Sequence, residues 1–97
     1  MKESIVQTQI KKALEASGWW VTKLLQTSTN GIPDIMALKD GRAIFIEVKK
    51  PGGKVSDLQK YRIDQLKKLG FTAFVSDSVD AIHEFIAEKI LPQSGVN

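Results

Sequence analysis

The chain contains no cysteine, which excludes disulfide bonds, iron–sulfur clusters and zinc sites built on thiolates. It contains one histidine, His83, and the absence of a second one argues against a metal site with histidine ligands. His83 falls on the flank of an expected C-terminal helix, far along the chain from the acids considered below, so we expect a surface residue there. These absences leave the acidic residues as the candidates for metal chemistry.

Long apolar runs are also absent. No run approaches the length of a membrane span, and no apolar segment follows the first residues, Met1 to Ser4, as it would in a signal peptide. We therefore expect a soluble cytoplasmic protein of a bacterial or phage-infected cell, without a membrane partner.

The length of 97 residues leaves room for one compact domain, and a hydrophobic share of 42% is enough for a modest core. We expect this single domain over residues 1–92 and a flexible tail over residues 93–97. A net charge of +3 and a pI near 9.3 permit binding to nucleic acid without demanding it.

Apolar periodicity predicts helices and strands in the order α-β-β-β-α-β-α. The expected strands are Trp19 to Leu25, Asp34 to the Asp40-Gly41 turn, Ala43 to Lys49, and Phe71 to Ser76; the expected helices run from about Lys2 to Ser17, from Ser56 to Gly70, and from Ser78 to Pro92. The core stripe of the second helix is expected to comprise Ile63, Leu66 and Leu69. The last strand follows a helix after one glycine, so it can pair parallel in the same sheet. The pattern fits an α/β fold with a four-stranded mixed sheet flanked by helices.

The central feature of the sequence is a predicted hairpin from Gly31 to Lys49. Asp40-Gly41 between two apolar runs is a strong signal for a tight hairpin turn. The second strand alternates, so that Glu47 and Lys49 share one face while Ile44, Ile46 and Val48 share the other. Asp34 follows a proline at the start of the first strand, where pairing can bring its carboxylate close to that of Glu47.

Two acids and a lysine on adjacent strands suit metal-assisted hydrolysis of a phosphodiester. Oxygen ligands favour a hard divalent cation, Mg²⁺ or Mn²⁺, which polarises the phosphate and helps to generate hydroxide at neutral pH. Lys49 could orient the water or offset the charge that develops in the transition state. A charged residue on a covered strand is costly without a partner, and either a metal ion or a salt bridge between Glu47 and Lys49 would offset that cost. The sequence leaves both arrangements open.

Pro33-Asp34 followed by Glu47-Val48-Lys49 after a hairpin resembles the signature of the PD-(D/E)XK nucleases. The wider pattern is similar to the VRR-NUC branch of that superfamily, the virus-type replication-repair nucleases. The ordered set that carries this resemblance is more specific than the bare Glu-x-Lys triplet, and it comprises Glu3, Asp34, Glu47, Lys49 and Gln59.

The resemblance implies a restriction-endonuclease-like core and a catalytic role for all five of these residues. It also implies that Asp34, Glu47 and the main-chain carbonyl of Val48 bind the metal ion. Lys50, Lys54 and Lys23 are the expected contacts to DNA.

Two members of this set also have a purely structural interpretation. Ser4 could cap the first helix with Gln7 closing a capping box, which would leave Glu3 outside the helix; a helix that begins earlier would turn Glu3 inward. Gln59 could cap the second helix by bonding back to Ser56, or it could reach the metal site. The local pattern leaves both questions open.

The resemblance favours a structure-selective DNA endonuclease that resolves four-way (Holliday) junctions in DNA repair as a homodimer. One small domain with one site cuts one strand at a time, whereas a two-fold dimer supplies two symmetric cuts. Trp19 and Trp20 are adjacent on a strand and must face opposite sides, so one is core and the other is a candidate contact. The alternatives are a DNA-binding module without catalysis, and a flap or single-strand nuclease of a repair complex.

Overall fold

A computed structural model of the chain describes residues 1–90, so the expected tail and the helix stop at Pro92 lie outside the described residues. The elements are α1 (Glu3–Ala16), β1 (Trp20–Lys23), β2 (Ile35–Lys39), β3 (Arg42–Val48), α2 (Asp57–Lys68), β4 (Thr72–Ser76) and α3 (Val79–Ile90). This is the predicted order, and the α/β fold with a four-stranded mixed sheet is confirmed. None of the described helices is long and apolar enough to cross a membrane.

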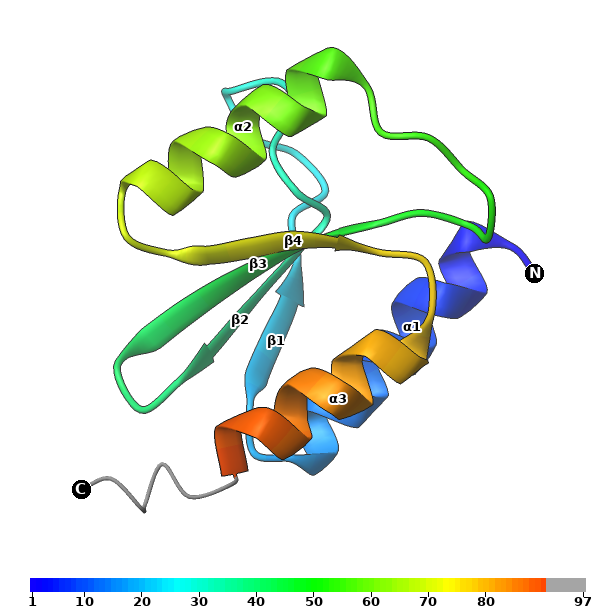
Figure 1. Cartoon of the computed structure of the whole chain (residues 1–97), viewed down its shortest axis with the longest axis vertical. Helices are drawn as coiled ribbons and strands as arrows, with labels where there is room; N and C mark the ends of the chain where they lie inside the picture. The colour runs from blue at the N-terminus through cyan, green and yellow to red at the C-terminus, as the bar shows by residue number, and fades with distance from the viewer. Residues whose placement is uncertain (91–97) are drawn as a thin grey trace.

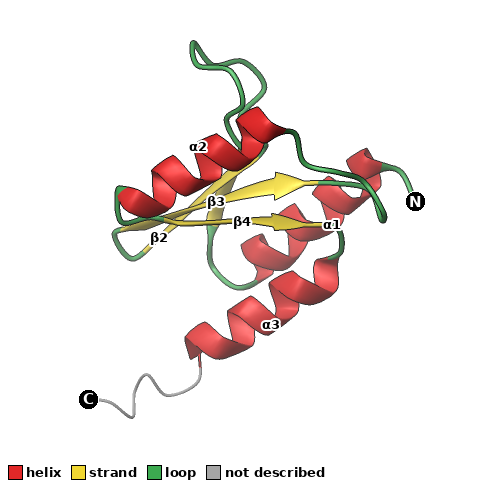
Figure 2. Cartoon of the chain, turned by 45° about the horizontal axis from the view of Figure 1, so that its top comes forward, coloured by secondary structure: helices red, strands yellow, loops and turns green. Residues whose placement is uncertain are grey.

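The sheet has the strand order β1-β2-β3-β4 (Figure 1). β1, β2 and β3 form an antiparallel meander, and β4 pairs parallel to β3 after the chain has crossed over through α2. Helices α1 and α3 lie together against one face of the sheet, and α2 lies on the other (Figure 2). Asp34, Glu47 and Lys49 lie at the end of the sheet where β3 finishes.

The alternation of β3 sorts its side chains between these two layers. Ile44, Ile46 and Val48 are buried toward α1 and α3, as predicted. They meet the buried stripe of α1, which is Val6, Ile10 and Leu14, and Ile82 of α3. Because side chains alternate, Glu47 must point to the other side, beneath α2.

The two adjacent tryptophans divide as expected. Trp19 is 5% exposed and contacts the ring of Phe85 on α3, with 6.1 Å between ring centroids, whereas Trp20 is 60% exposed. The predicted stripe of α2 is only partly right. Ile63 is buried, but Leu69 is 67% exposed, because the helix has ended by then and Leu69 is its C-cap.

The loop between β1 and β2 is held against α2. The guanidinium Nε of Arg62 donates to the carbonyl oxygen of Asn30 at 2.8 Å. Next to it, Gly31 adopts a φ of +83° and lies so close to the helix that a Cβ atom would meet Cγ of Leu58 at 2.7 Å. This contact fixes α2 relative to the segment that leads into Asp34.

We predict that Gly31→Ala destabilises the fold more than Gly52→Ala does. Both glycines have positive φ values, +83° and +79°, so alanine is strained at either position, but nothing lies within 4 Å of a Cβ at Gly52. Crowding against Leu58, which is half-exposed and can partly yield, should add about 1 kcal/mol at Gly31. Urea unfolding of the two variants measures the difference in their free energies of unfolding. Equal losses of stability would show that the contact between Gly31 and α2 accommodates an added methyl group without cost.

Candidate active site

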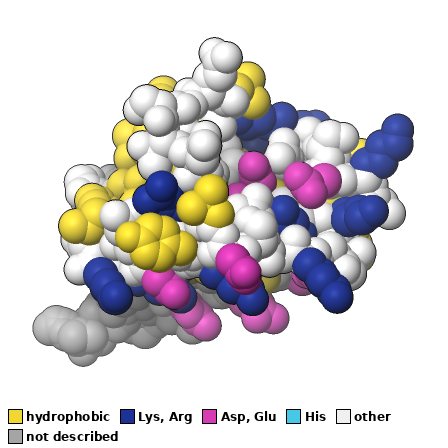
Figure 3. All heavy atoms as spheres, turned by 90° about the horizontal axis from the view of Figure 1, so that it is seen from above, with side chains coloured by type: hydrophobic (Ala, Val, Ile, Leu, Met, Phe, Trp, Pro, Cys, Tyr) yellow, Lys and Arg dark blue, Asp and Glu magenta, His cyan; other side chains and the backbone are white. Residues whose placement is uncertain are grey.

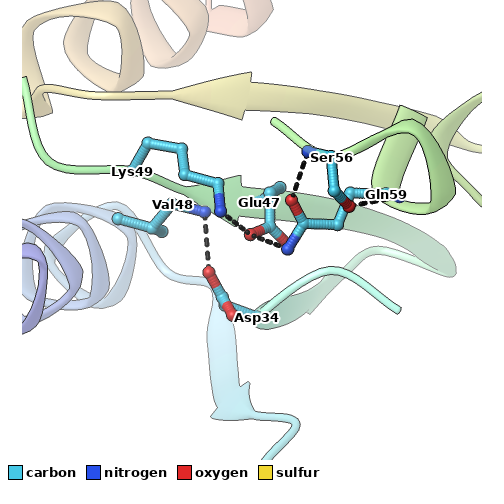
Figure 4. Close-up of polar contacts among 6 residues, drawn as sticks. All are labelled: Asp34, Glu47, Val48, Lys49, Ser56 and Gln59. Atoms are coloured by element: carbon cyan, nitrogen blue, oxygen red, sulfur yellow. Dashed lines mark hydrogen bonds and ion pairs between the residues drawn. The ribbon is translucent and has the colours of Figure 1, made fainter. Parts of the chain in front are cut away.

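Asp34 and Glu47 come from neighbouring strands at the same end of the sheet (Figure 4). The last paired residues there are Ile35 of β2 and Ile46 of β3. Continuing this antiparallel register by one residue places Asp34 opposite Glu47. The expectation that strand pairing brings the two carboxylates together is therefore confirmed, although β2 begins one residue later than predicted.

Asp34 is held by the main chain on both sides. Its Oδ2 accepts a hydrogen bond from the backbone N–H of Val48 at 2.9 Å, and its carbonyl oxygen accepts from the backbone N–H of Leu24 at 2.7 Å. The side chain thus joins the end of β3, while the carbonyl joins the end of β1. No sequence pattern indicated this second, structural role, because it depends on contacts between three strands.

Glu47 is the most buried acid of the site, with only 2% of its surface exposed. Its Oε2 accepts a hydrogen bond from Nε2 of Gln59 at 3.1 Å and lies 3.4 Å from Nζ of Lys49. Its Oε1 is buried and has no hydrogen-bond partner in the described part of the chain. The salt bridge considered from the sequence therefore exists, but it satisfies only one of the two carboxylate oxygens.

Burial shifts the protonation of this carboxyl group. Loss of hydration is the largest cause that raises the pKa of Glu47, to about 7, and the negative charge of Asp34 adds to it; Lys49 acts in the opposite direction. A divalent cation at Oε1 would favour the charged form of Glu47. An unpartnered buried oxygen opposite a second carboxylate is thus a donor set that fits Mg²⁺ or Mn²⁺.

Gln59 caps the second helix and also contacts Glu47. Its Oε1 accepts from the backbone N–H of Ser56 at 2.9 Å, and Oγ of Ser56 accepts from the backbone N–H of Gln59 at 3.1 Å, which completes a capping box. The other end of the same amide donates to Glu47 (Figure 4). The two alternatives left open by the sequence are therefore not exclusive.

Glu3 lies inside α1, in its first turn, and is half-buried. The alternative with Ser4 as helix cap is wrong, because the N-cap is Lys2 and Ser4 is within the helix. Among the described side chains, however, no three acidic or histidine residues lie close enough together to hold a metal ion, so Glu3 does not form a cluster with Asp34 and Glu47. Its catalytic role stays a prediction.

The lysines named as candidates occupy the same end of the sheet. Lys49 is 16% exposed in its side chain and follows β3 directly, and Lys50 and Lys54 are exposed in the loop before α2. Lys23 is half-buried at the end of β1, paired with Ile35. Basic side chains gather over this loop and the start of α1, at the right of Figure 3, while exposed hydrophobic side chains lie at the left. His83 is exposed on α3, as expected.

Comparisons with known proteins show which domain family this chain is similar to. The sequence model of the VRR-NUC domain family matches residues 1–80. A protein of Acyrthosiphon pisum secondary endosymbiont phage 1, provisionally named nuclease p44, is 30% identical over 81 residues, which is 82% of this chain and 87% of that protein.

Two solved structures are similar to the whole fold. One, named as a VRR-NUC domain, has a TM-score of 0.79 and 31% sequence identity, covering 90% of this chain and 96% of its own. Another, named as a VRR-NUC domain protein, has a TM-score of 0.72 and 21% identity over 90% of this chain and 86% of its own. The second likeness concerns the fold alone.

We predict that Glu47→Gln stabilises the metal-free protein above neutral pH. The folded state raises the pKa of Glu47 from 4.5 to about 7, so it binds a proton more tightly than the unfolded state does. The stability of the wild-type protein relative to Glu47→Gln should therefore fall as the pH rises from about 4.5 to 7 and then level off. Urea unfolding at a series of pH values with excess chelator measures it, and a pH-independent difference would contradict the prediction.

Proposed function

Because the chain belongs to the VRR-NUC family of nucleases, we propose that it is a DNA endonuclease that depends on Mg²⁺ or Mn²⁺. The observation that carries the proposal is the buried carboxylate of Glu47, whose Oε1 has no partner in the described chain and lies on the strand beside Asp34. The proposed ligands are Asp34, Glu47 and the main-chain carbonyl of Val48. A buried carboxylate with one oxygen left without a partner is costly, and a bound cation would offset the cost.

The bound cation supplies Lewis-acid chemistry and a nucleophilic hydroxide near neutral pH. Around it, each side chain has a separate task. Asp34 and Glu47 hold negative charge where the cation would bind. Gln59 holds the second oxygen of Glu47 through a hydrogen bond, and Lys49 holds it through an ion pair. Lys49, 3.4 Å from Glu47, carries positive charge at the reacting phosphate, where it orients water or offsets developing charge. Lys50, Lys54 and Lys23 neutralise phosphates of the DNA at the same end of the sheet.

Asp34→Asn is the sharpest test of this proposal. Asparagine keeps an oxygen that can accept from the N–H of Val48, whereas Asp34→Ala would lose both that hydrogen bond and the proposed ligand charge. We expect Asp34→Asn to fold normally, to bind DNA, and to lose more than about 100-fold in cleavage, beyond the range usual for residues outside the ligand shell.

The control for this variant is Asp64→Asn, which removes an exposed carboxylate from α2 and should cleave as the wild-type protein does. Cleavage is measured on a panel of labelled single-stranded, duplex, flap, splayed and four-way DNAs, with Mg²⁺ or with excess chelator. Full activity of Asp34→Asn, or activity in chelator, would show that the site does not work through a metal ion.

The proposed substrate is a four-way junction, and the proposed active form is a homodimer. A single domain with one site makes one cut, and a two-fold dimer matches the symmetry of a junction. The apolar residues of α3 are poor candidates for the interface, because Ile82 is fully buried and Phe85 and Ile86 pack against the core. Trp20 is the better candidate, since it is 60% exposed and pairs on the sheet with Leu38, itself 38% exposed.

We predict a dimer in solution that makes paired nicks on opposite arms of a junction, and a monomer for Trp20→Lys. The matched control is Tyr61→Lys, which replaces an aromatic residue of similar exposure, 57%, on α2 and should remain dimeric. Light scattering at the assay concentration gives the oligomeric state. A wild-type protein that is monomeric and prefers flaps or single strands would favour a repair-complex nuclease instead, and DNA binding without any cleavage would favour a non-catalytic module.

A further inference from the structure

The side-chain amide of Gln59 contacts a hydrogen-bond donor at one end and a hydrogen-bond acceptor at the other. At one end, Oε1 accepts from the backbone N–H of Ser56 at 2.9 Å; at the other, Nε2 donates to Oε2 of Glu47 at 3.1 Å. The two ends of a glutamine amide have almost the same shape but opposite polarity. If the amide were reversed, its oxygen would face the Glu47 carboxylate, and two acceptors would lie against each other.

Ser56 decides which way the amide points. A backbone N–H can only donate, so it selects the oxygen end of Gln59 and leaves the NH₂ group for Glu47 (Figure 4). The position of that N–H is fixed in turn by the role of Ser56 as N-cap of α2. Its backbone is extended, with φ −72° and ψ 162°, and its Oγ accepts from the N–H of Gln59 at 3.1 Å.

The direction of the amide determines which oxygen of Glu47 is left over. Gln59 donates to Oε2 and Lys49 forms an ion pair with the same oxygen, while Oε1 stays buried and without a hydrogen-bond partner in the described chain. Without the NH₂ group of Gln59 at Oε2, the carboxylate would lose one of the two donors that hold its orientation. Oε1 of Glu47 would then no longer be held in one position.

We propose that Ser56 is a positioning residue of the metal site, an inference that rests on the proposed function. It acts through its two hydrogen bonds with Gln59. It orients Gln59, Gln59 orients Glu47, and Glu47 presents Oε1 to a divalent cation. The helix cap and the metal site are therefore one hydrogen-bonded unit.

The test compares Ser56→Ala with Ser56→Thr and Ile63→Val. Ser56→Ala removes the Oγ that anchors the cap, and Ser56→Thr keeps a capping hydroxyl and should restore the wild-type behaviour. Ile63→Val removes one buried methylene group from the same helix and causes a comparable loss of stability without touching the unit. This control variant shows whether a loss of metal affinity comes from lower helix stability or from a change in the orientation of the Gln59 amide.

The first measurement is the Mn²⁺ affinity of each variant by calorimetry. We expect Ser56→Ala to bind Mn²⁺ about tenfold more weakly, in the range found for residues that orient metal ligands, and the other two variants to bind as the wild type does. The second is the side-chain amide signal of Gln59 in nitrogen–proton NMR spectra of the metal-free protein, identified by its loss in Gln59→Leu. In Ser56→Ala the chemical shifts of its two protons should move toward those of a solvent-exposed glutamine side chain.

Each outcome separates this inference from the proposed function. If the wild-type protein binds Mn²⁺ and cuts DNA but Ser56→Ala has the same affinity and the same Gln59 signal, the role of Ser56 is overturned and the nuclease proposal stands. Equal weakening in Ile63→Val would also overturn it, since the effect would be one of stability. If the wild-type protein neither binds Mn²⁺ nor cuts, the metal site itself is overturned, and only the NMR effect of Ser56→Ala would remain as a structural link.

Discussion

The buried carboxylate of Glu47 is the constraint around which this small protein is built. Taking a carboxylate out of water costs several kcal/mol unless other groups replace its hydration. In the described chain, Gln59 and Lys49 replace the lost water at Oε2, whereas Oε1 has no hydrogen-bond partner. Burial of this carboxylate and the negative charge of Asp34 together raise the pKa of Glu47 to about 7. A fold selected for stability alone would not leave the acid in this state.

The layers of the fold explain how the acid stays buried. One face of β3 is committed to the core with α1 and α3, so the alternation of the strand turns Glu47 toward α2. The parallel crossover from β3 to β4 places α2 over that face, with its N-terminal turn at the end of the strand. Arg62 then ties the same helix to the loop that precedes Asp34. The acids are thus held by two strands and a helix that contact one another independently of any ligand.

Much of this arrangement could be predicted, because it follows from local periodicity. Alternation along β3 placed Glu47 and Lys49 on one face, and the hairpin turn implied the register that sets Asp34 opposite Glu47. The sequence pattern offered two roles for Gln59, but it could not show that one amide serves both the cap and the carboxylate.

The parts that could not be predicted depend on contacts between elements that are distant in sequence. The hydrogen bond from Arg62 to the carbonyl of Asn30 spans 32 positions in the sequence. Its acceptor is a main-chain group, so no pattern of side chains reveals it. The start of α1 was ambiguous for a different reason. Ser4 with Gln7 has the local form of a capping box, but the helix begins earlier, at Glu3, with no side-chain cap at all. Packing of Val6 and Ile10 in the core outweighs the local cap preference.

The unequal anchoring of the two acids has an evolutionary consequence. The side chain of Asp34 accepts a hydrogen bond from the main chain at the end of β3, so a descendant that no longer needed to cut DNA would still benefit from Asp or Asn at that position. Glu47 gives no such benefit, since a neutral residue of similar shape relieves its burial. Inactive descendants of this domain should therefore lose the glutamate first and keep the aspartate as a relic of the site.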